Sequence, residues 1–369
     1  MIEQDAIAAV TRAFDVDGEF KSAVRYGSGH IHDTYSVVFE DGGRSGAHII
    51  LQRINTKVFK NPVAMMENIR RVTMHVRSRL EGVTDADRRV LRLVLTREGP
   101  TWHVDEQERY WRAYQFIEGA QTFDEVTSER QASEAAKAFG GFQRMLADLP
   151  GERLAESIPH FHDTPKRFAD FELAVVADAA GRAKDVRNEI AFAMERRRMA
   201  GALVEARLPE RVTHNDTKLN NVLLDERTGE GICVIDLDTV MPGLAAYDFG
   251  DMVRTMTCPA AEDEPDLAQV EMRFALFEAV LRGYLAGAGD FLTREERESL
   301  ITGAKVIVFE QGIRFLADYL AGDTYYKVSR AGQNLDRCRT QFKLLESIEG
   351  QEAKMDGLLK SVARQASSY

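Results

Sequence analysis

Residues 211–238, with the sequence RVTHNDTKLNNVLLDERTGEGICVIDLD, interrupt a chain whose pattern after residue 120 is otherwise helical. Two short apolar runs, Asn221–Asp225 and Ile232–Leu237, flank a turn that contains Gly229. Short apolar runs on either side of such a turn predict a β-hairpin. Polar residues stand directly before the first run and at the end of the second. We therefore expect the chemistry of the protein at that end of the hairpin.

The polar residues before the hairpin follow the pattern His-x-Asp-x-x-x-x-Asn, formed by His214, Asp216 and Asn221. This is the spacing of a kinase catalytic loop. A carboxylate near an acceptor hydroxyl can orient that group and take its proton, and an amide oxygen can reach a metal ion on nucleotide phosphates. Alone, each residue would be an ordinary turn residue. Together, beside a hairpin, they predict a kinase with Asp216 as base and Asn221 as magnesium ligand.

Two carboxylates compete for the second metal position, Asp236 in VIDLD and Asp248 in YDFGD at 247–251. In protein kinases the aspartate of Asp-Phe-Gly binds the metal. Here the hairpin favours Asp236, because an antiparallel strand would return it towards Asn221, whereas Asp248 follows a further loop. We therefore predict that Asp236 binds the metal. Asp248 is expected to be a helix N-cap, with Asp251 completing a capping box.

Two further polar residues near this pattern have more than one interpretation. Lys218 would balance charge on the transferring phosphate, or it would be a solvated surface lysine. We assign it to the catalytic group. Asp238 would support the metal ligand, bind a second metal or cap a turn, and these alternatives remain open.

A glycine turn lies between two predicted strands of the first third, at Tyr26-Gly27-Ser28-Gly29-His30. Backbone N–H groups in such a turn can hold phosphates, because glycine permits close approach. On its own the turn is a weak pattern, and a plain hairpin turn is the default. Its place at the start of a kinase-like lobe favours nucleotide contacts from Gly27, Ser28 and Gly29.

The strand predicted at 48–54 lacks the lysine that grips the α- and β-phosphates in protein kinases. Gln52 or Arg53 must occupy that place, and strand alternation leaves the choice open; Gln52 is our candidate. The QFIEG segment after a later strand joins the predicted lobes. Its residues Gln115 and Ile117 would offer backbone groups to the adenine.

The order of patterns predicts an α+β, two-lobed, protein-kinase-like fold. A small antiparallel-sheet lobe with one helix would span residues 1–116 and bind the nucleotide. A larger, mostly helical lobe would span 117–369 and carry the catalytic loop, the metal site and the sugar pocket. The predicted strands of the first lobe are 24–26, 34–40, 48–54, 90–96 and 110–116, with a helix starting at Asn61-Pro62.

Composition excludes several classes of partner. The chain has 369 residues, 44% of them hydrophobic and 29% charged, and a formal net charge of -11. This charge gives no general attraction to nucleic acid or to an anionic membrane. Three cysteines without a CxxC pair fit a reducing compartment, and no stretch approaches the length of a membrane span. We expect a cytoplasmic protein with no nucleic-acid or membrane partner; a monomer is favoured, although the sequence does not fix the oligomeric state.

In the order of its catalytic loop, IDLD strand end and YDFGD, the chain resembles the aminoglycoside phosphotransferase and choline kinase superfamily. More closely, it resembles bacterial N-acetylhexosamine 1-kinases, through YGSGHI, FHDTP, THNDTKLNN, IDLDTVMPG and RFLADYL. The resemblance covers nearly the whole chain. It implies ATP- and Mg2+-dependent phosphorylation of the anomeric hydroxyl of N-acetylglucosamine or N-acetylgalactosamine by direct transfer. It also implies sugar contacts from His30, Asp216, Asp251 and Arg314.

Other interpretations remain open. Arg314 has Glu310 and Asp318 four residues away on either side, so it is either held by them or aimed into a cleft. A kinase of an aminoglycoside, choline or an amino alcohol would need carboxylates for its cationic acceptor, and AEDEPD at 261–266 would be one source. A non-catalytic sugar or nucleotide sensor is the third possibility. The missing strand lysine favours a sensor, and the intact set of Asp216, Asn221 and Asp236 opposes it.

Overall fold

The computed structural model describes residues 2–27, 29 and 31–366, and the chain forms two compact units. The first, which we call the sheet unit, comprises Met1–Asp124, Asp148–Pro159 and Leu223–Met241. The second, the helical unit, comprises Glu125–Ala147, His160–Val222 and Pro242–Tyr369. The predicted lobe boundary at 116/117 stays a prediction.

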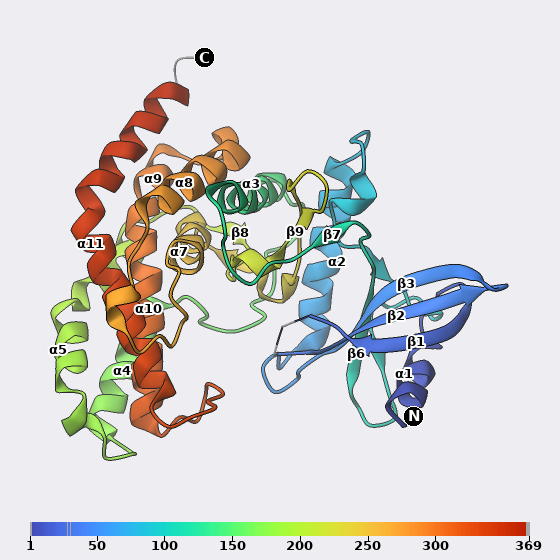
Figure 1. The fold of residues 1–369 in the computed structure, drawn as a ribbon, viewed down its shortest axis with the longest axis horizontal. Helices are drawn as coiled ribbons and strands as arrows, with labels where there is room; N and C mark the ends of the chain where they lie inside the picture. The colour runs from blue at the N-terminus through green and yellow to red at the C-terminus, as the bar shows by residue number, and fades with distance from the viewer. Residues whose placement is uncertain (1, 28, 30, 367–369) are drawn as a thin grey trace. The chain divides into compact units, whose positions relative to one another are not determined.

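The elements alternate between strands and helices in the first third and are mostly helical later (Figure 1). The strands are β1 Glu19–Arg25, β2 Asp33–Asp41, β3 Arg44–Arg53, β4 Leu93–Val94, β5 His103–Val104, β6 Tyr110–Gln115, β7 Ala120–Gln121, β8 Arg211–Thr213, β9 Val222–Asp225, β10 Gly231–Val234 and β11 Met241–Gly243. The helices are α1 Ile2–Thr11, α2 Pro62–Arg79, α3 Glu129–Met145, α4 Thr164–Ala177, α5 Arg187–Glu195, α6 Ala202–Glu205, α7 Ala245–Met256, α8 Phe274–Ala288, α9 Arg294–Glu298, α10 Leu300–Ala321 and α11 Gln333–Ala366.

The sheet unit is built on an antiparallel sheet with the strand order β1-β2-β3-β6-β4, and β5 also pairs with β6. In this register Gln52 of β3 lies opposite Thr34 of β2 and Arg112 of β6. Residues opposite each other in neighbouring strands share a face of the sheet. Gln52 and Arg112 therefore point to the same side. The predicted α+β fold with a small antiparallel sheet is confirmed, although the strand predicted at 90–96 is only the two-residue β4.

The core of the sheet unit includes an apolar stripe near the N-terminus. Ile7 and Val10 of α1 and the following Phe14 are 4%, 6% and 0% exposed and pack with buried residues of β2 and β3. The predicted start of α2 is also confirmed, because Asn61 caps the helix by accepting the N–H of Ala64 at 3.1 Å.

The predicted hairpin is present as β9 and β10, which pair with each other in a three-stranded sheet of order β10-β9-β7. β9 begins directly after Asn221, and β10 ends two residues before Asp236. β7 pairs with β9 in antiparallel register, with Ala120 opposite Asp225. The hairpin is thus joined to the segment that follows β6.

In the helical unit, α3 packs against α8, and α10 packs against α4, α7 and α11. Figure 1 shows α10 and α11 running side by side. At Gly250 the backbones of α7 and α10 approach closely: a Cβ on Gly250 would lie 2.4 Å from the carbonyl oxygen of Gly303. Because no side chain fits there, Gly250 is required by close helix packing.

Among residues 2–27, 29 and 31–366, no helix is both long enough and apolar enough to cross a bilayer.

Candidate active site

The segment His214–Asn221 connects β8 to β9 and ends in a short 3-10 turn at Leu219–Asn221. Asn215 has a left-handed backbone with φ of 65°, a conformation that asparagine tolerates better than most residues. Its side chain is held locally, since the hydroxyl of Thr213 donates to Asn215 Oδ1 at 3.0 Å. The residue before Asp216 is therefore fixed in an unusual conformation that sets the direction of the loop.

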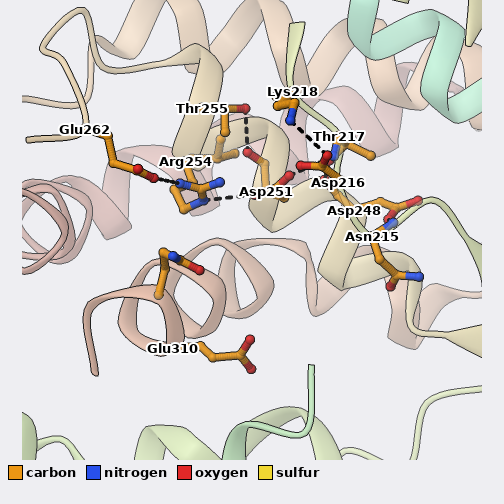
Figure 2. Close-up of polar contacts among 12 residues, drawn as sticks. Asn215, Asp216, Thr217, Lys218, Asp248, Asp251, Arg254, Thr255, Glu262 and Glu310 are labelled. Carbon is orange, nitrogen blue, oxygen red and sulfur yellow. Dashed lines mark hydrogen bonds and ion pairs between the residues drawn. The ribbon is translucent and has the colours of Figure 1, made fainter. Parts of the chain in front are cut away.

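Two carboxylates of α7 hold the backbone of this loop (Figure 2). The N–H groups of His214 and Asn215 donate to the two oxygens of Asp248 at 2.9 and 2.7 Å. The N–H of Thr217 donates to Asp251 Oδ2 at 2.7 Å. Hydrogen bonds to carboxylates therefore hold the backbone of the two residues before Asp216 and of the residue after it. Hydrogen bonds to a charged acceptor are the stronger kind.

Asp248 of the Asp-Phe-Gly motif is thus a buried residue that supports the loop. Asp248 is fully buried, and Gln143 also donates to its Oδ2 at 2.5 Å. Burial raises the pKa of Asp248, although His214 and the hydrogen bonds that it accepts act in the opposite direction. The expectation that Asp248 is a helix N-cap with Asp251 in a capping box is wrong. The helix begins three residues earlier, at Ala245, with Leu244 in the cap position and no side-chain cap.

Asp216 itself is partly exposed, with 26% of its side chain accessible. Lys218 Nζ lies 3.0 Å from Asp216 Oδ2, and Asn221 Nδ2 donates to the same oxygen at 3.0 Å. Burial opposes ionisation, but the charges of Lys218 and His214 outweigh it and hold the pKa of Asp216 below its ordinary value. Asp216 is therefore a carboxylate at neutral pH, as a proton acceptor must be.

Asn221 is oriented by the loop that it closes. Its amide nitrogen also donates to the backbone oxygen of Asp216 at 2.8 Å, and a carbonyl can only accept, so this contact fixes which end of the amide is nitrogen. The amide oxygen is left to face another group. An oxygen donor of this kind fits Mg2+, which binds hard oxygen ligands and few protein groups beyond substrate phosphates. In the described part of the chain, no group of three or more His, Cys, Asp or Glu side chains that could hold a metal occurs.

Asp236 lies in the sheet unit, directly after the hairpin. Its backbone is left-handed, with φ of 58° and ψ of 57°, and its side chain does not cap the short turn Leu237–Thr239 that follows. A non-glycine residue in this region carries a conformational cost that the surroundings must sustain. Its carboxylate is half-buried and chemically suited to Mg2+.

Asp238, left open by the sequence, is the centre of a buried polar network in the sheet unit. Arg112, 1% exposed, pairs with both carboxylate oxygens of Asp238. Arg112 Nε donates to Gln52 Oε1 at 2.9 Å, and Gln52 donates to Thr34 at 3.1 Å. Burial raises the pKa of Asp238, but Arg112 and His32 reverse the effect and hold it well below its usual range. Asp238 is a permanently ionised structural anion.

Gln52 and Arg53, the two candidates for the missing strand lysine, point to opposite faces of the sheet. Neighbouring residues of a strand point to opposite faces. Gln52 points into the network of Asp238, whereas Arg53 Nε pairs with Asp33 Oδ2 at 2.7 Å on the other face. Nucleotide binding by Gln52 stays a prediction, and its side chain already has partners on both sides.

The predicted nucleotide loop is described only in part, because Ser28 and His30 lie outside the described residues. Gly27 has φ of 80°, which requires a residue without Cβ strain, and a Cβ on Gly29 would meet open space. The N–H of Gln115 donates to Arg92 at 2.9 Å, so this group is used within the sheet unit. Ile117 is 8% exposed and packs with Ala120, Ile232 and Cys233. Nucleotide contacts of these residues remain predictions.

Arg314 is 11% exposed on α10 and only loosely paired. Its Nη1 donates to Gln311 at 3.2 Å and lies 3.9 Å from Glu310, while the rings of Phe161 and Tyr326 lie 5.7 Å from its guanidinium carbon. An arginine with aromatic neighbours, whose carboxylate partner Glu310 lies 3.9 Å away, can still donate to an oxygen-rich ligand. Its sugar contact stays a prediction, as does that of Asp251, whose oxygens bind Thr217 and Arg254.

Sequence reasoning missed His162 and the role of Glu310. Glu310, 1% exposed, accepts from His162 Nδ1 at 2.9 Å and from the hydroxyl of Thr164 at 2.6 Å. His162 Nε2 lies 3.2 Å from the carbonyl oxygen of Asn215. One histidine therefore links α10 to the residue before Asp216. The motif FHDTP holds both His162 and Thr164, but its partner lies 148 residues away and no local spacing indicates it.

Comparisons with known proteins agree with this architecture. The model of the family described as "Phosphotransferase enzyme family" matches residues 22–288. The fold is similar to that of a microcompartment-associated aminopropanol kinase (17% identity, TM-score 0.62, 95% of this chain and 98% of that one). It is also similar to spectinomycin phosphotransferase solved with ADP and spectinomycin (12%, 0.60, 94% and 98%). A choline/ethanolamine kinase family protein from Mesorhizobium loti matches as well (16%, 0.52, 92% and 93%). At these identities the structures show a shared protein-kinase-like fold.

Proposed function

The chain belongs to the phosphotransferase enzyme family, and from that premise we propose that it transfers the γ-phosphate of ATP to a hydroxyl of a small molecule. The observation that carries the proposal is the state of Asp216. It is a partly exposed, ionised carboxylate in a loop whose backbone is held by Asp248 and Asp251.

Asp216 orients the acceptor hydroxyl and takes its proton as the oxygen attacks the γ-phosphorus. The bond from phosphorus to the bridging oxygen of ADP then breaks, and no covalent enzyme intermediate is needed. Lys218 holds Asp216 ionised, at 3.0 Å, and offers positive charge to the transferring phosphate. Because three backbone hydrogen bonds fix the loop, Asp216 needs little rearrangement before reaction.

We propose Asn221 and Asp236 as the protein ligands of the metal, which when bound neutralises charge on the nucleotide phosphates. Asn221 presents an amide oxygen because the loop uses its nitrogen. Asp236 presents a carboxylate from a strained turn. The proposal requires both oxygens to face one ion in the working enzyme. It extends to nucleotide contacts from Gly27, Ser28, Gly29, Gln52, Gln115 and Ile117.

For the acceptor we propose an N-acetylhexosamine, phosphorylated at its anomeric hydroxyl, with contacts from His30, Arg314 and Asp251. Support comes from the motifs THNDTKLNN and FHDTP and from the pairing of acidic groups in the helical unit. Among its described residues, each buried carboxylate already has a donor partner; these are Asp248, Asp251, Glu296, Glu310 and Asp318. Such a unit suits a neutral acceptor better than a cation.

The second candidate is a kinase of an amino alcohol, choline or an aminoglycoside. Its specific support is the fold likeness to an aminopropanol kinase, a spectinomycin phosphotransferase and a choline/ethanolamine kinase family protein. Against it, the acidic loop 261–266 is itself paired: Glu262 lies 3.1 Å from Arg254, and Asp263 lies 3.3 Å from Arg330. A cationic acceptor would have to displace an arginine there.

One assay separates these candidates. The protein is incubated with ATP, Mg2+ and single acceptors: N-acetylglucosamine, N-acetylgalactosamine, an amino alcohol, choline and an aminoglycoside. ADP formation is measured, and phosphorus NMR locates the new phosphate. A hexosamine 1-phosphate that is absent with Asp216→Asn supports the proposal, and a phosphorylated amine supports the second candidate. ATP binding without turnover on any acceptor would instead indicate a sensor.

A further inference from the structure

The sheet unit lacks the ion pair that fixes the nucleotide site of protein kinases, which joins a lysine of the third strand to a glutamate of the following helix. At the strand position stands Gln52. On α2, Glu67 is 47% exposed and pairs with Arg70 of its own helix at 2.7 Å. Gln52 cannot form such an ion pair, and Glu67 pairs with Arg70 instead, while the segment after the hairpin has contacts of its own.

A different set of contacts reaches this segment from three elements of the sheet unit. From β6, Arg112 pairs with both oxygens of Asp238. From the turn before β2, His32 Nε2 lies 2.5 Å from Asp238 Oδ2. Its Nδ1 accepts the N–H of Asn55 at 3.0 Å, so the proton of a neutral ring lies on Nε2, towards the carboxylate. From α2, Asn68 Nδ2 donates to the carbonyl oxygen of Val240 at 3.2 Å.

The side chains that make these contacts are themselves held in place. Arg112 and Asn68 are 1% and 3% exposed. The ring of His32 stacks on buried Phe59 with centroids 5.4 Å apart. Asn68 is fixed in turn, because it donates to the carbonyl oxygen of Ala155 at 2.7 Å and accepts that residue's N–H at 3.1 Å. The anchors therefore cost little further ordering when a ligand binds.

Asp238 and Val240 lie two and four residues after the left-handed Asp236, and such a backbone persists only where its surroundings hold it. We propose that Arg112, His32 and Asn68 are positioning residues, here called the loop anchors, that fix segment 236–240 and so aim the carboxylate of Asp236. This inference rests on the proposed function, in which Asp236 binds Mg2+.

The test uses the full chain and the double variant Arg112→Met/Asp238→Asn, which removes both charges of the buried pair. A single change would leave an unpaired buried charge and could prevent folding. Glu67→Gln is the matched control, since Glu67 lies on α2 and pairs with Arg70 of the same helix at an exposed site. Folding of each variant is checked by circular dichroism and thermal unfolding.

Two measurements follow. Without metal or nucleotide, hydrogen exchange of a peptide covering 236–240 should be faster in the double variant, while exchange of β3 stays unchanged. Calorimetric binding of a non-hydrolysable ATP analogue, with and without Mg2+, should show that the gain in affinity due to Mg2+ falls about 10- to 100-fold. Affinity without Mg2+ should be unchanged, and Glu67→Gln should match the unaltered protein in both measurements.

The outcomes separate the two proposals. If the double variant folds and keeps the full effect of Mg2+, or if binding weakens equally with and without Mg2+, the loop anchors do not position Asp236. If its peptide 236–240 exchanges as slowly as in the unaltered protein, the anchoring itself is refuted. If the unaltered protein binds no nucleotide, or gains nothing from Mg2+, the proposed function fails and this inference fails with it.

Discussion

Replacing Asp248 by asparagine should damage the fold of the catalytic loop and leave the response to Mg2+ intact. The carboxylate accepts three donors, from His214, Asn215 and Gln143, at 2.9, 2.7 and 2.5 Å. An asparagine has one acceptor oxygen, so its NH2 group would face at least one of these donors. Losing a hydrogen bond to a buried carboxylate costs about 1.5–3 kcal/mol, and the orphaned donor adds to that cost.

Part of this loss is offset, because burial raises the pKa of Asp248 and so disfavours its charged form, whereas asparagine is neutral. We expect a net loss of about 2–3 kcal/mol in the free energy of unfolding, which corresponds to a fall in Tm of about 4–12 °C for a unit of this size. Urea unfolding followed by circular dichroism gives the first quantity. The Mg2+ concentration for half-maximal turnover should stay unchanged in the fraction that is folded.

Asp236→Asn is the matched comparison, since asparagine tolerates the left-handed backbone of that residue. It should keep the free energy of unfolding to within about 1 kcal/mol and abolish Mg2+-dependent turnover. The reverse pattern would refute the reasoning. If Asp248→Asn is as stable as the unaltered protein but needs far more Mg2+, while Asp236→Asn remains active, the metal ligand is the Asp-Phe-Gly aspartate.

Four further outcomes are expected. Asp216→Asn should lower kcat about 10²- to 10⁴-fold without weakening nucleotide binding; an unchanged single-turnover rate would remove Asp216 from this role. Lys218→Ala should shift the acid limb of the kcat profile to higher pH, because Lys218 lowers the pKa of Asp216; an unmoved limb would contradict that coupling. Glu310 is held below its ordinary pKa, since His162 outweighs the effect of burial. Its contribution to stability is therefore complete above about pH 4.3 and is lost as the pH falls through the lower folded value, so Glu310→Gln should flatten the dependence of Tm on pH there. Arg314→Met should raise KM for the acceptor about 10- to 100-fold and leave KM for ATP unchanged; equal rises in both would argue against a specific acceptor contact.

Features set by local chemistry could be predicted from the sequence. The helix start predicted at Asn61-Pro62 depends on neighbouring residues alone, and in the structure Asn61 caps α2. The hairpin was also predictable, because two apolar runs and a glycine turn have few other arrangements.

Features set by tertiary packing could not be predicted. Arg112 and Asp238 are 126 residues apart in the chain, and no spacing rule joins them. Asp248 was placed at a helix start because its neighbours imitate a capping box. The competing fact is that both of its oxygens are needed by the catalytic loop, deep inside the helical unit. The Asp-Phe-Gly motif thus has a structural role here that only its tertiary contacts show.

The glycine contact between α7 and α10 sets a length scale for the acceptor. With Gly250 against Gly303, neither helix can slide along the other by part of a turn. α7 carries the carboxylates that hold Asp216, and α10 carries Arg314 eleven residues beyond the contact, about 16 Å along the helix axis. The packing of α7 against α10 therefore fixes the position of Arg314 relative to Asp216. Under the proposed function, a relative that phosphorylates a larger or smaller molecule would have to carry its arginine one helical turn earlier or later in α10, because the two helices cannot shift.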